Sequence, residues 1–179
     1  DTHVNPDFKV LEKFAEPSFR ARLDEFKPYL REREAADGGS RTSLSIGPIR
    51  FDRFPGEAPK AGDDAAVVGG RDAIEGRTRS GHRGKVQPNT QDENNEGRIM
   101  DMDIEGRDLD LIFPTQWVTT LTCLEDLTLS HGLYRSYHHY MQEYCSIAPE
   151  RLKSILQLPG ADPEWSIAEL KKWGNEKWV

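Results

Sequence analysis

The sequence predicts an α/β fold in which short strands alternate with helices and pair in parallel. Two apolar segments, at 109–114 and 152–158, are each followed by a longer segment with helical periodicity. Capping residues, Thr122 and Asp162, stand where those helices would begin. Because strands joined through helices form right-handed parallel units, we expect one parallel sheet with these helices on one outer face.

The first six residues, Asp1–Pro6, are predicted to form the end of a β-strand. Asp1 and His3 are two positions apart, so both side chains lie on the same side of an extended chain. A carboxylate oxygen and an imidazole nitrogen in this arrangement can reach one divalent ion. The alternative is a surface turn that ends at Asn5 and Pro6.

A helix is predicted over residues 8–36. Its apolar residues recur at spacings of four, three and four, which places them on one face: Phe19, Leu23, Phe26 and Leu30. Pro17 suits a first-turn position, whereas Pro28 is expected to kink or split the helix.

Extended segments at 44–46 and 49–54 flank Gly47-Pro48 and predict a small hairpin or extended pair. The region 55–97 that follows is rich in Gly, Asp, Arg and Asn and has only isolated aliphatic residues. So long a connection in a compact domain is typical either of a functional lid or of a partly disordered segment. The sequence leaves both open.

The second half of the chain repeats the strand-then-helix unit. The predicted elements are a helix from Asn95 to a glycine cap at Gly106, a buried strand at 109–114, a helix at 123–147, a strand at 152–158, a helix at 163–173 and the approach to one more strand at 175–179. On the long helix, Cys145 is predicted to face the core as a small hydrophobe. Surface or helix–sheet contacts, and not metal binding, are expected for His131, His138 and His139.

Composition excludes several classes of partner. The net charge of −7 argues against nucleic acid or an anionic membrane surface. Two cysteines, Cys123 and Cys145, do not form a disulfide framework, which favours a reduced, cytoplasmic protein. No apolar run approaches the ~18 residues of a membrane span. The chain has no initiator Met, so residue 1 is not obviously the start of the translated protein.

Five short motifs, in a consistent order, give the chain a resemblance to a known family. They are Asp1–Pro6, Arg98–Gly106 leading into Leu111–Thr115, Tyr134–Tyr137, Tyr144–Leu152, and Leu158-Pro159 followed by Asp162–Leu170. Together they resemble the N-terminal half of the amidohydrolase-related family of metal enzymes, in the branch of aminocarboxymuconate-semialdehyde decarboxylase. Residues 95–173 carry most of the resemblance, and residues 8–94 carry little.

The resemblance implies the N-terminal part of a (β/α)8 TIM-type barrel. Residues 1–7 would end the first barrel strand, residues 8–94 would form a long inserted lid, and residues 95–179 would supply β/α units. The family's remaining metal ligands, a His after the fifth strand and an Asp after the eighth, lie beyond this sequence. A complementary C-terminal half-barrel chain, a homologous subunit or further residues would therefore complete the barrel.

The resemblance also implies site residues. The family's metal motif falls on Asp1 and His3, which would bind one divalent ion, Zn, Mn or Fe. An alternative register aligns His3 and Asn5 with the motif, but Asn is a poor ligand for transition metals. Active sites of such barrels lie at the carboxyl ends of the strands. The residues expected to line a substrate pocket there are Asn5, Thr115, Gln116 and Trp117, with packing against the lid as the alternative for Trp117.

The activity implied is that of a metal-dependent hydrolase or a non-oxidative decarboxylase. Its substrate would be a carboxylate, an acyl compound or an aromatic acid. We expect no activity from this chain alone, because a catalytic metal needs three or more protein ligands. The alternatives are a non-catalytic structural subunit of a heterodimeric metalloenzyme, or an excerpt of a longer polypeptide.

Overall fold

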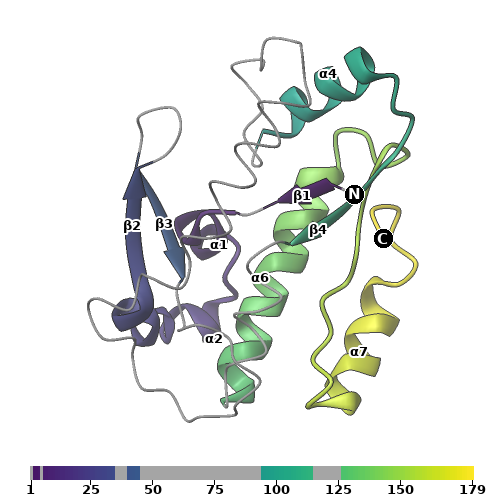
Figure 1. Cartoon of the computed structure of the whole chain (residues 1–179). Helices are drawn as coiled ribbons and strands as arrows, with labels where there is room; N and C mark the ends of the chain where they lie inside the picture. The colour runs from purple at the N-terminus through teal and green to yellow at the C-terminus, as the bar shows by residue number, and fades with distance from the viewer. Residues whose placement is uncertain (1, 5, 35–39, 45–93, 115–125) are drawn as a thin grey trace.

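The chain folds as a mixed α/β protein with two small sheets (Figure 1). The computed structural model describes residues 2–4, 6–34, 40–44, 94–114 and 126–179. One sheet is parallel, in the order β1 (Thr2–Val4), β4 (Asp110–Pro114), β5 (Leu152–Ser154). The other is an antiparallel pair of β2 (Leu30–Glu34) and β3 (Ser40–Leu44).

The predicted parallel pairing is confirmed. Strand β4 pairs with β5 in parallel, with Ile112 opposite Ser154. Strand β1 lies on the other side of β4, where His3 is opposite Phe113. The carboxyl ends of the three strands therefore meet at one edge of the sheet.

All three helices predicted for the second half are present, and α4 and α7 match their predicted boundary signals. Helix α4 (Asn95–Glu105) ends at Gly106, whose φ of 71° is the left-handed conformation that a glycine cap adopts. Helix α7 (Pro163–Trp173) has Asp162 as its N-cap and ends at Gly174. Helix α6 (Leu127–Cys145) begins later than predicted, because Asp126 caps it by accepting hydrogen bonds from two backbone amides. The capping box expected at 122–125 lies outside the described residues.

The helix predicted over 8–36, kinked or split at Pro28, was wrong. This segment forms α1 (Phe8–Lys13), α2 (Pro17–Arg20) and a 3-10 helix, η1 (Leu23–Tyr29), and then continues as strand β2. Pro17 lies in the first turn of α2, as predicted. It also holds the preceding residue, Glu16, in an extended conformation, so α1 and α2 do not join into one helix. Phe19 and Phe26 are nevertheless buried, so the apolar spacing did identify core residues.

Strand β2 owes its extended form to pairing with β3 over five residue pairs. Pairing with this neighbouring strand has overridden the helical pattern that Leu30 completes. The hairpin predicted at 44–46 and 49–54 lies outside the described residues, apart from Leu44 at the end of β3.

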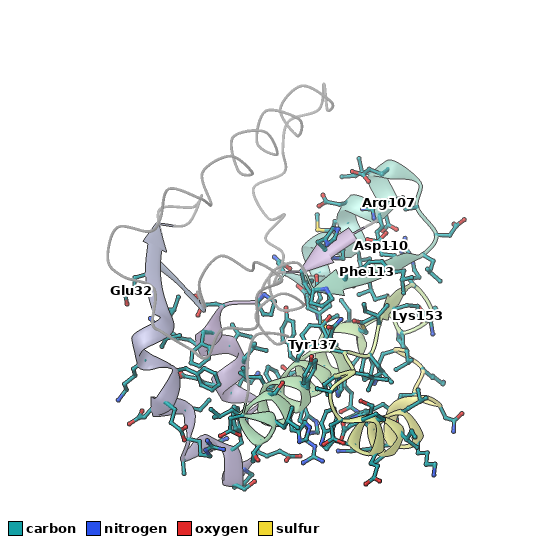
Figure 2. All side chains as sticks on the ribbon, turned by 60° about the horizontal axis from the view of Figure 1, so that its bottom comes forward. Glu32, Arg107, Asp110, Phe113, Tyr137 and Lys153 are labelled. Carbon is teal, nitrogen blue, oxygen red and sulfur yellow. The ribbon has the colours of Figure 1, made fainter. Side chains whose placement is uncertain are left out.

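The hydrophobic core gathers around α6. Fully buried residues of α6, Leu133, Tyr137 and Met141, belong to one cluster with Val4, Ile112 and Leu152 of the sheet. Tyr137 also hydrogen bonds to Ser154 of β5, with 3.2 Å between the hydroxyl oxygens (Figure 2). Helix α6 therefore covers one face of the sheet. Cys145 is fully buried in this core, as predicted.

The expectation that 109–114 is wholly buried was wrong. Burial alternates along β4, with Asp110 and Ile112 buried but Leu111 43% exposed. Side chains of a strand point alternately to its two faces, and among the described residues the face toward α6 is the covered one. A central parallel strand is usually covered on both faces.

Strand β5 is shorter than predicted. It stops at Ser154, whose amide donates to the carbonyl of Trp178, and Gln157 uses its backbone to bond the ring of His138. Ile155 still donates to the carbonyl of Ile112 at 3.4 Å, and by Gln157 the backbone has turned to α6. Residues 175–179 form turns there in place of the predicted strand. Among the described helices, none is long and apolar enough to cross a membrane.

Candidate functional site

The sheet edge where the three parallel strands end is the candidate site. His3 is the exposed middle residue of the short strand β1, and its ring lies beside that of Phe113, with 6.0 Å between ring centroids. Because Val4 is fully buried in the core, the alternation of a strand places His3 on the opposite face, away from α6. Leu111 and Phe113 of β4 lie on that same face and are partly exposed. His3 is therefore next to a partly exposed apolar surface.

Most of the predicted site residues cannot be placed. Asp1, Asn5, Thr115, Gln116 and Trp117 lie outside the described residues. Of the predicted metal ligands, the structure thus places His3 alone. Its imidazole is a ligand type that suits a transition metal. Among the described residues, there is no group of three or more His, Cys, Asp or Glu side chains that could hold a metal ion.

Arg98 ties the end of β1 to two other elements. From the first turn of α4, its Nη2 donates to the backbone carbonyl of His3 at 2.8 Å. Its Nε donates to the Tyr144 hydroxyl at 2.8 Å, and Nη1 lies 3.5 Å from Asp110 Oδ2. The Arg98 side chain is only 12% exposed. Strand β1, strand β4 and helix α6 therefore meet around one guanidinium.

Asp110 is the buried anion of this cluster. Its carboxylate lies between Arg98 and Arg107 and pairs with the guanidinium of each (Figure 2). A buried carboxylate without such partners would carry a large desolvation cost. Burial acts to lower the pKa of Arg107, but its bonds to Asp110 and Glu105 outweigh burial and raise it. Arg107 is therefore charged at neutral pH.

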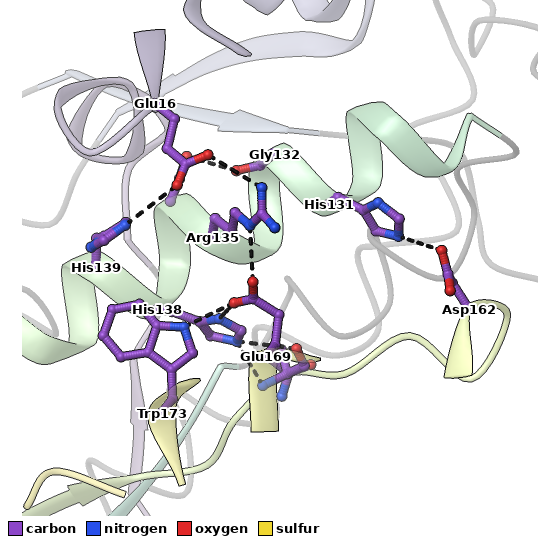
Figure 3. A network of polar contacts seen from close by, with 11 residues as sticks. Glu16, His131, Gly132, Arg135, His138, His139, Asp162, Glu169 and Trp173 are labelled. Atoms are coloured by element: carbon purple, nitrogen blue, oxygen red, sulfur yellow. Dashed lines mark hydrogen bonds and ion pairs between the residues drawn. The ribbon is translucent and has the colours of Figure 1, made fainter. Parts of the chain in front are cut away.

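A second polar network joins α6 to α7 (Figure 3). His138 is fully buried, with Nδ1 3.3 Å from Glu169 Oε2 and Nε2 3.1 Å from the carbonyl oxygen of Gln157. Glu169 also accepts hydrogen bonds from Arg135 and Trp173, at 2.9 and 2.8 Å. Burial acts to raise the pKa of Glu169, but the bonds from these three side chains lower it to about 2. The network holds the helices together and lies away from solvent.

The other two histidines of α6 also have packing partners. His131 stacks on Trp165 with 4.3 Å between ring centroids, and burial lowers its pKa. His139 packs against Trp173 and lies 3.8 Å from Glu16. The surface or helix–sheet contacts expected for these histidines are found only in part. His131 and His139 are partly exposed, but His138 is fully buried, and all three rings contact side chains of α7 rather than the sheet.

A shallow groove of about 500 Å³ lies beside His139. The groove is lined by residues of α6, by residues of the segment between α1 and α2, and by the residue after α6: Phe14, Glu16, His139, Gln142, Glu143 and Ser146. His139 is a partly exposed histidine in a different environment from His3. A substitution of His139 is therefore a matched control for metal binding by His3.

Arg98, Asp110 and Glu169 were not singled out from the sequence as interacting residues. Asp110 was detectable as a charge inside an apolar strand, since a buried charge requires a partner. Glu169 was detectable because it falls between Trp165 and Trp173 at a spacing of four, on the inner face of α7. Nothing local in the sequence connects Arg98 to the carbonyl of His3.

Comparison with known proteins adds no identity. The chain matches no known family model, and no curated protein is significantly similar to it.

Proposed function

We propose that this chain provides the first part of a metal-dependent active site, in a (β/α)8 barrel of the amidohydrolase-related type. The observation that carries the proposal is the position of His3. It is exposed in β1, one residue before the strand's carboxyl end, on the face of the parallel sheet opposite α6.

The geometry of such barrels supports this interpretation. Their helices cover the outside of the sheet, their strands point apolar side chains inward, and their active sites lie at the carboxyl ends of the strands. Here α6 covers one face, and Leu111 and Phe113 lie on the other with His3. That uncovered face would be the barrel interior, and His3 would point into it.

In this proposal His3 and Asp1 hold one divalent ion, Zn, Mn or Fe, together with ligands from later strands. The ion, when bound, polarises a substrate carbonyl or carboxylate, or lowers the pKa of a water molecule. The pocket would be lined by Asn5, Thr115, Gln116 and Trp117. The substrate class is a carboxylate, an acyl compound or an aromatic acid, and the reaction is hydrolysis or non-oxidative decarboxylation.

Metal binding by the full chain tests the proposal. We expect His3→Ala to weaken the affinity for Zn²⁺ by at least about tenfold, because even groups that only support a ligand contribute about ten- to a hundredfold. Calorimetric titration with Zn²⁺, with metal analysis of the purified protein, measures this. Asp1→Asn should act in the same direction.

His139→Ala is the matched control, because His139 is a half-exposed histidine beside the acidic groove. Its Zn²⁺ affinity should stay within about twofold of the unmodified chain. If His139→Ala weakens binding while His3→Ala does not, the metal site lies at the groove and the proposed function is wrong.

A second candidate is a structural subunit that packs against a complementary half-barrel. Apolar side chains on two outer surfaces favour it, with Leu111 on the sheet 43% exposed and Ile167 and Leu170 on α7 53% and 50% exposed. An interface between two half-barrels would be large and apolar. In that case the metal and the catalytic groups would belong mainly to the partner.

A further inference from the structure

The end of β1 needs support beyond its own strand pairing. Strand β1 has three residues, and among the described strands it pairs with β4 alone. A short edge strand has few ladder hydrogen bonds and frays readily. The carbonyl of His3, at the middle of the strand, accepts a hydrogen bond from Arg98 Nη2 at 2.8 Å.

Arg98 is itself held in place from two directions. Tyr144 of α6 accepts from its Nε at 2.8 Å, and the Tyr144 ring centroid is 5.9 Å from the guanidinium carbon. Asp110 of β4, buried on the covered face of the sheet, provides the opposite charge. Nearby, Asn95 donates to the Tyr144 carbonyl at 2.9 Å and fixes the start of α4 on α6. The guanidinium therefore has a defined orientation before it contacts β1.

The geometry requires arginine in particular. A guanidinium presents donors in a rigid plane, so one side chain can bond a carbonyl, a hydroxyl and a carboxylate at the same time. A lysine ammonium is a single point charge on a flexible stem and would satisfy fewer of these partners.

We infer that Arg98 is the positioning residue for His3, holding the end of β1 so that the imidazole keeps one place at the sheet edge. This inference rests on the proposed function, in which His3 binds the metal. Arg98 acts through the backbone of His3 and contributes no ligand.

The experiment compares Arg98→Met, Arg98→Lys and Arg107→Met in the full chain. Arg107 is a matched control because it also pairs with Asp110, and with Glu105, but is not the residue that donates to the His3 carbonyl. Two properties are measured: hydrogen–deuterium exchange of the peptide containing β1, and Zn²⁺ affinity by calorimetry. Thermal unfolding of each variant confirms that it is folded.

We expect Arg98→Met to speed exchange in β1 by roughly tenfold and to weaken Zn²⁺ binding by about ten- to a hundredfold. Arg98→Lys should retain part of the slow exchange in β1 and part of the Zn²⁺ affinity. Arg107→Met should lower thermal stability but leave β1 exchange and Zn²⁺ affinity within about twofold. If Arg98→Met fails to fold, Tyr144→Phe, which removes the hydroxyl that Arg98 bonds, should shift both measurements in the same direction by a smaller factor.

Unchanged exchange of β1 in Arg98→Met overturns the inference. So do equal effects of Arg98→Met and Arg107→Met, because these would reflect the loss of a partner for Asp110 alone. A His3→Ala variant with unchanged Zn²⁺ affinity overturns the proposed function, whatever Arg98 does. The exchange measurement does not depend on metal, so the two failures are distinguishable.

Discussion

Glu169 shows how a single buried charge is made favourable. It is almost fully buried, yet His138, Arg135 and Trp173 all donate to its carboxylate. Charged hydrogen bonds of this kind are about twice as strong as neutral ones. The donors outweigh burial and set the pKa of Glu169 at about 2, below the ordinary value of 4.5.

The lowered pKa predicts acid sensitivity with a definite sign. Because the folded state favours the ionised form, Glu169 stabilises the fold fully above pH 4.5, and this contribution is lost as the pH falls from 4.5 toward 2. The expected loss is on the order of 3 kcal/mol, since each pKa unit corresponds to about 1.4 kcal/mol. Urea unfolding at a series of pH values between neutrality and pH 2 measures it.

Glu169→Gln is the corresponding variant. It removes the negative charge that faces Arg135 and places an amide next to the donor groups that bonded the carboxylate. We therefore expect the free energy of unfolding to fall by about 2 kcal/mol at neutral pH. Its stability should also fall less between pH 4.5 and 2 than that of the unmodified protein. Parallel pH curves for the two proteins would contradict this role of Glu169.

At the scale of elements, capping decides where the helices end. Asn94, Asp126 and Asp162 each accept a backbone amide hydrogen bond at a helix start. Gly106 ends α4 in the left-handed conformation, directly before Arg107 and the buried Asp110. This cap therefore determines how the chain turns from α4 into β4.

Gly106→Ala should destabilise the protein by about 1–2 kcal/mol, because a Cβ atom is strained at positive φ. No heavy atom lies within 4 Å of a Cβ added there, so the cost is conformational and not steric. Gly160→Ala is the control: it also has open space, but its φ is not in the left-handed range. Its stability should stay within about 0.5 kcal/mol of the unmodified protein. Equal midpoints of urea unfolding for the two variants would show that the cap is unimportant.

On the scale of the whole molecule, α6 organises the described parts of the chain. The N-terminal helices and the three-stranded sheet both contribute to the one core cluster that contains its apolar residues. Helix α7 is attached through the Glu169 network (Figure 3). The sheet face opposite α6 keeps apolar side chains partly exposed, as the half-barrel proposal requires.

This surface predicts self-association of the chain in isolation. Leu111→Lys, on the uncovered sheet face, should shift the chain toward its monomer mass of 20.4 kDa, because it places a charge where apolar contact would form. Met100→Lys is the control, since Met100 is 54% exposed but lies on α4. Size-exclusion chromatography with light scattering compares them. Equal effects of both variants would mean that association is not specific to the sheet.

Prediction from sequence succeeded where a signal is local. Periodicity, capping residues and the glycine at 106 identified α4, α6 and α7, and their alternation with apolar strands indicated the parallel pairing of β4 and β5. It failed at 30–34, where a helical spacing was overridden by pairing with β3. It also overestimated the burial of β4 and the length of β5.

The candidate site divides in the same way. The chemistry of His3 and its place at a strand end follow from the residues themselves, because strand geometry and ligand type are local properties. The contacts of Arg98 with His3, Asp110 and Tyr144 join residues up to 95 positions apart in sequence, and those of Glu169 with His138 join two different helices. Such contacts depend on how packed elements bring distant side chains together, and only the tertiary structure decides that.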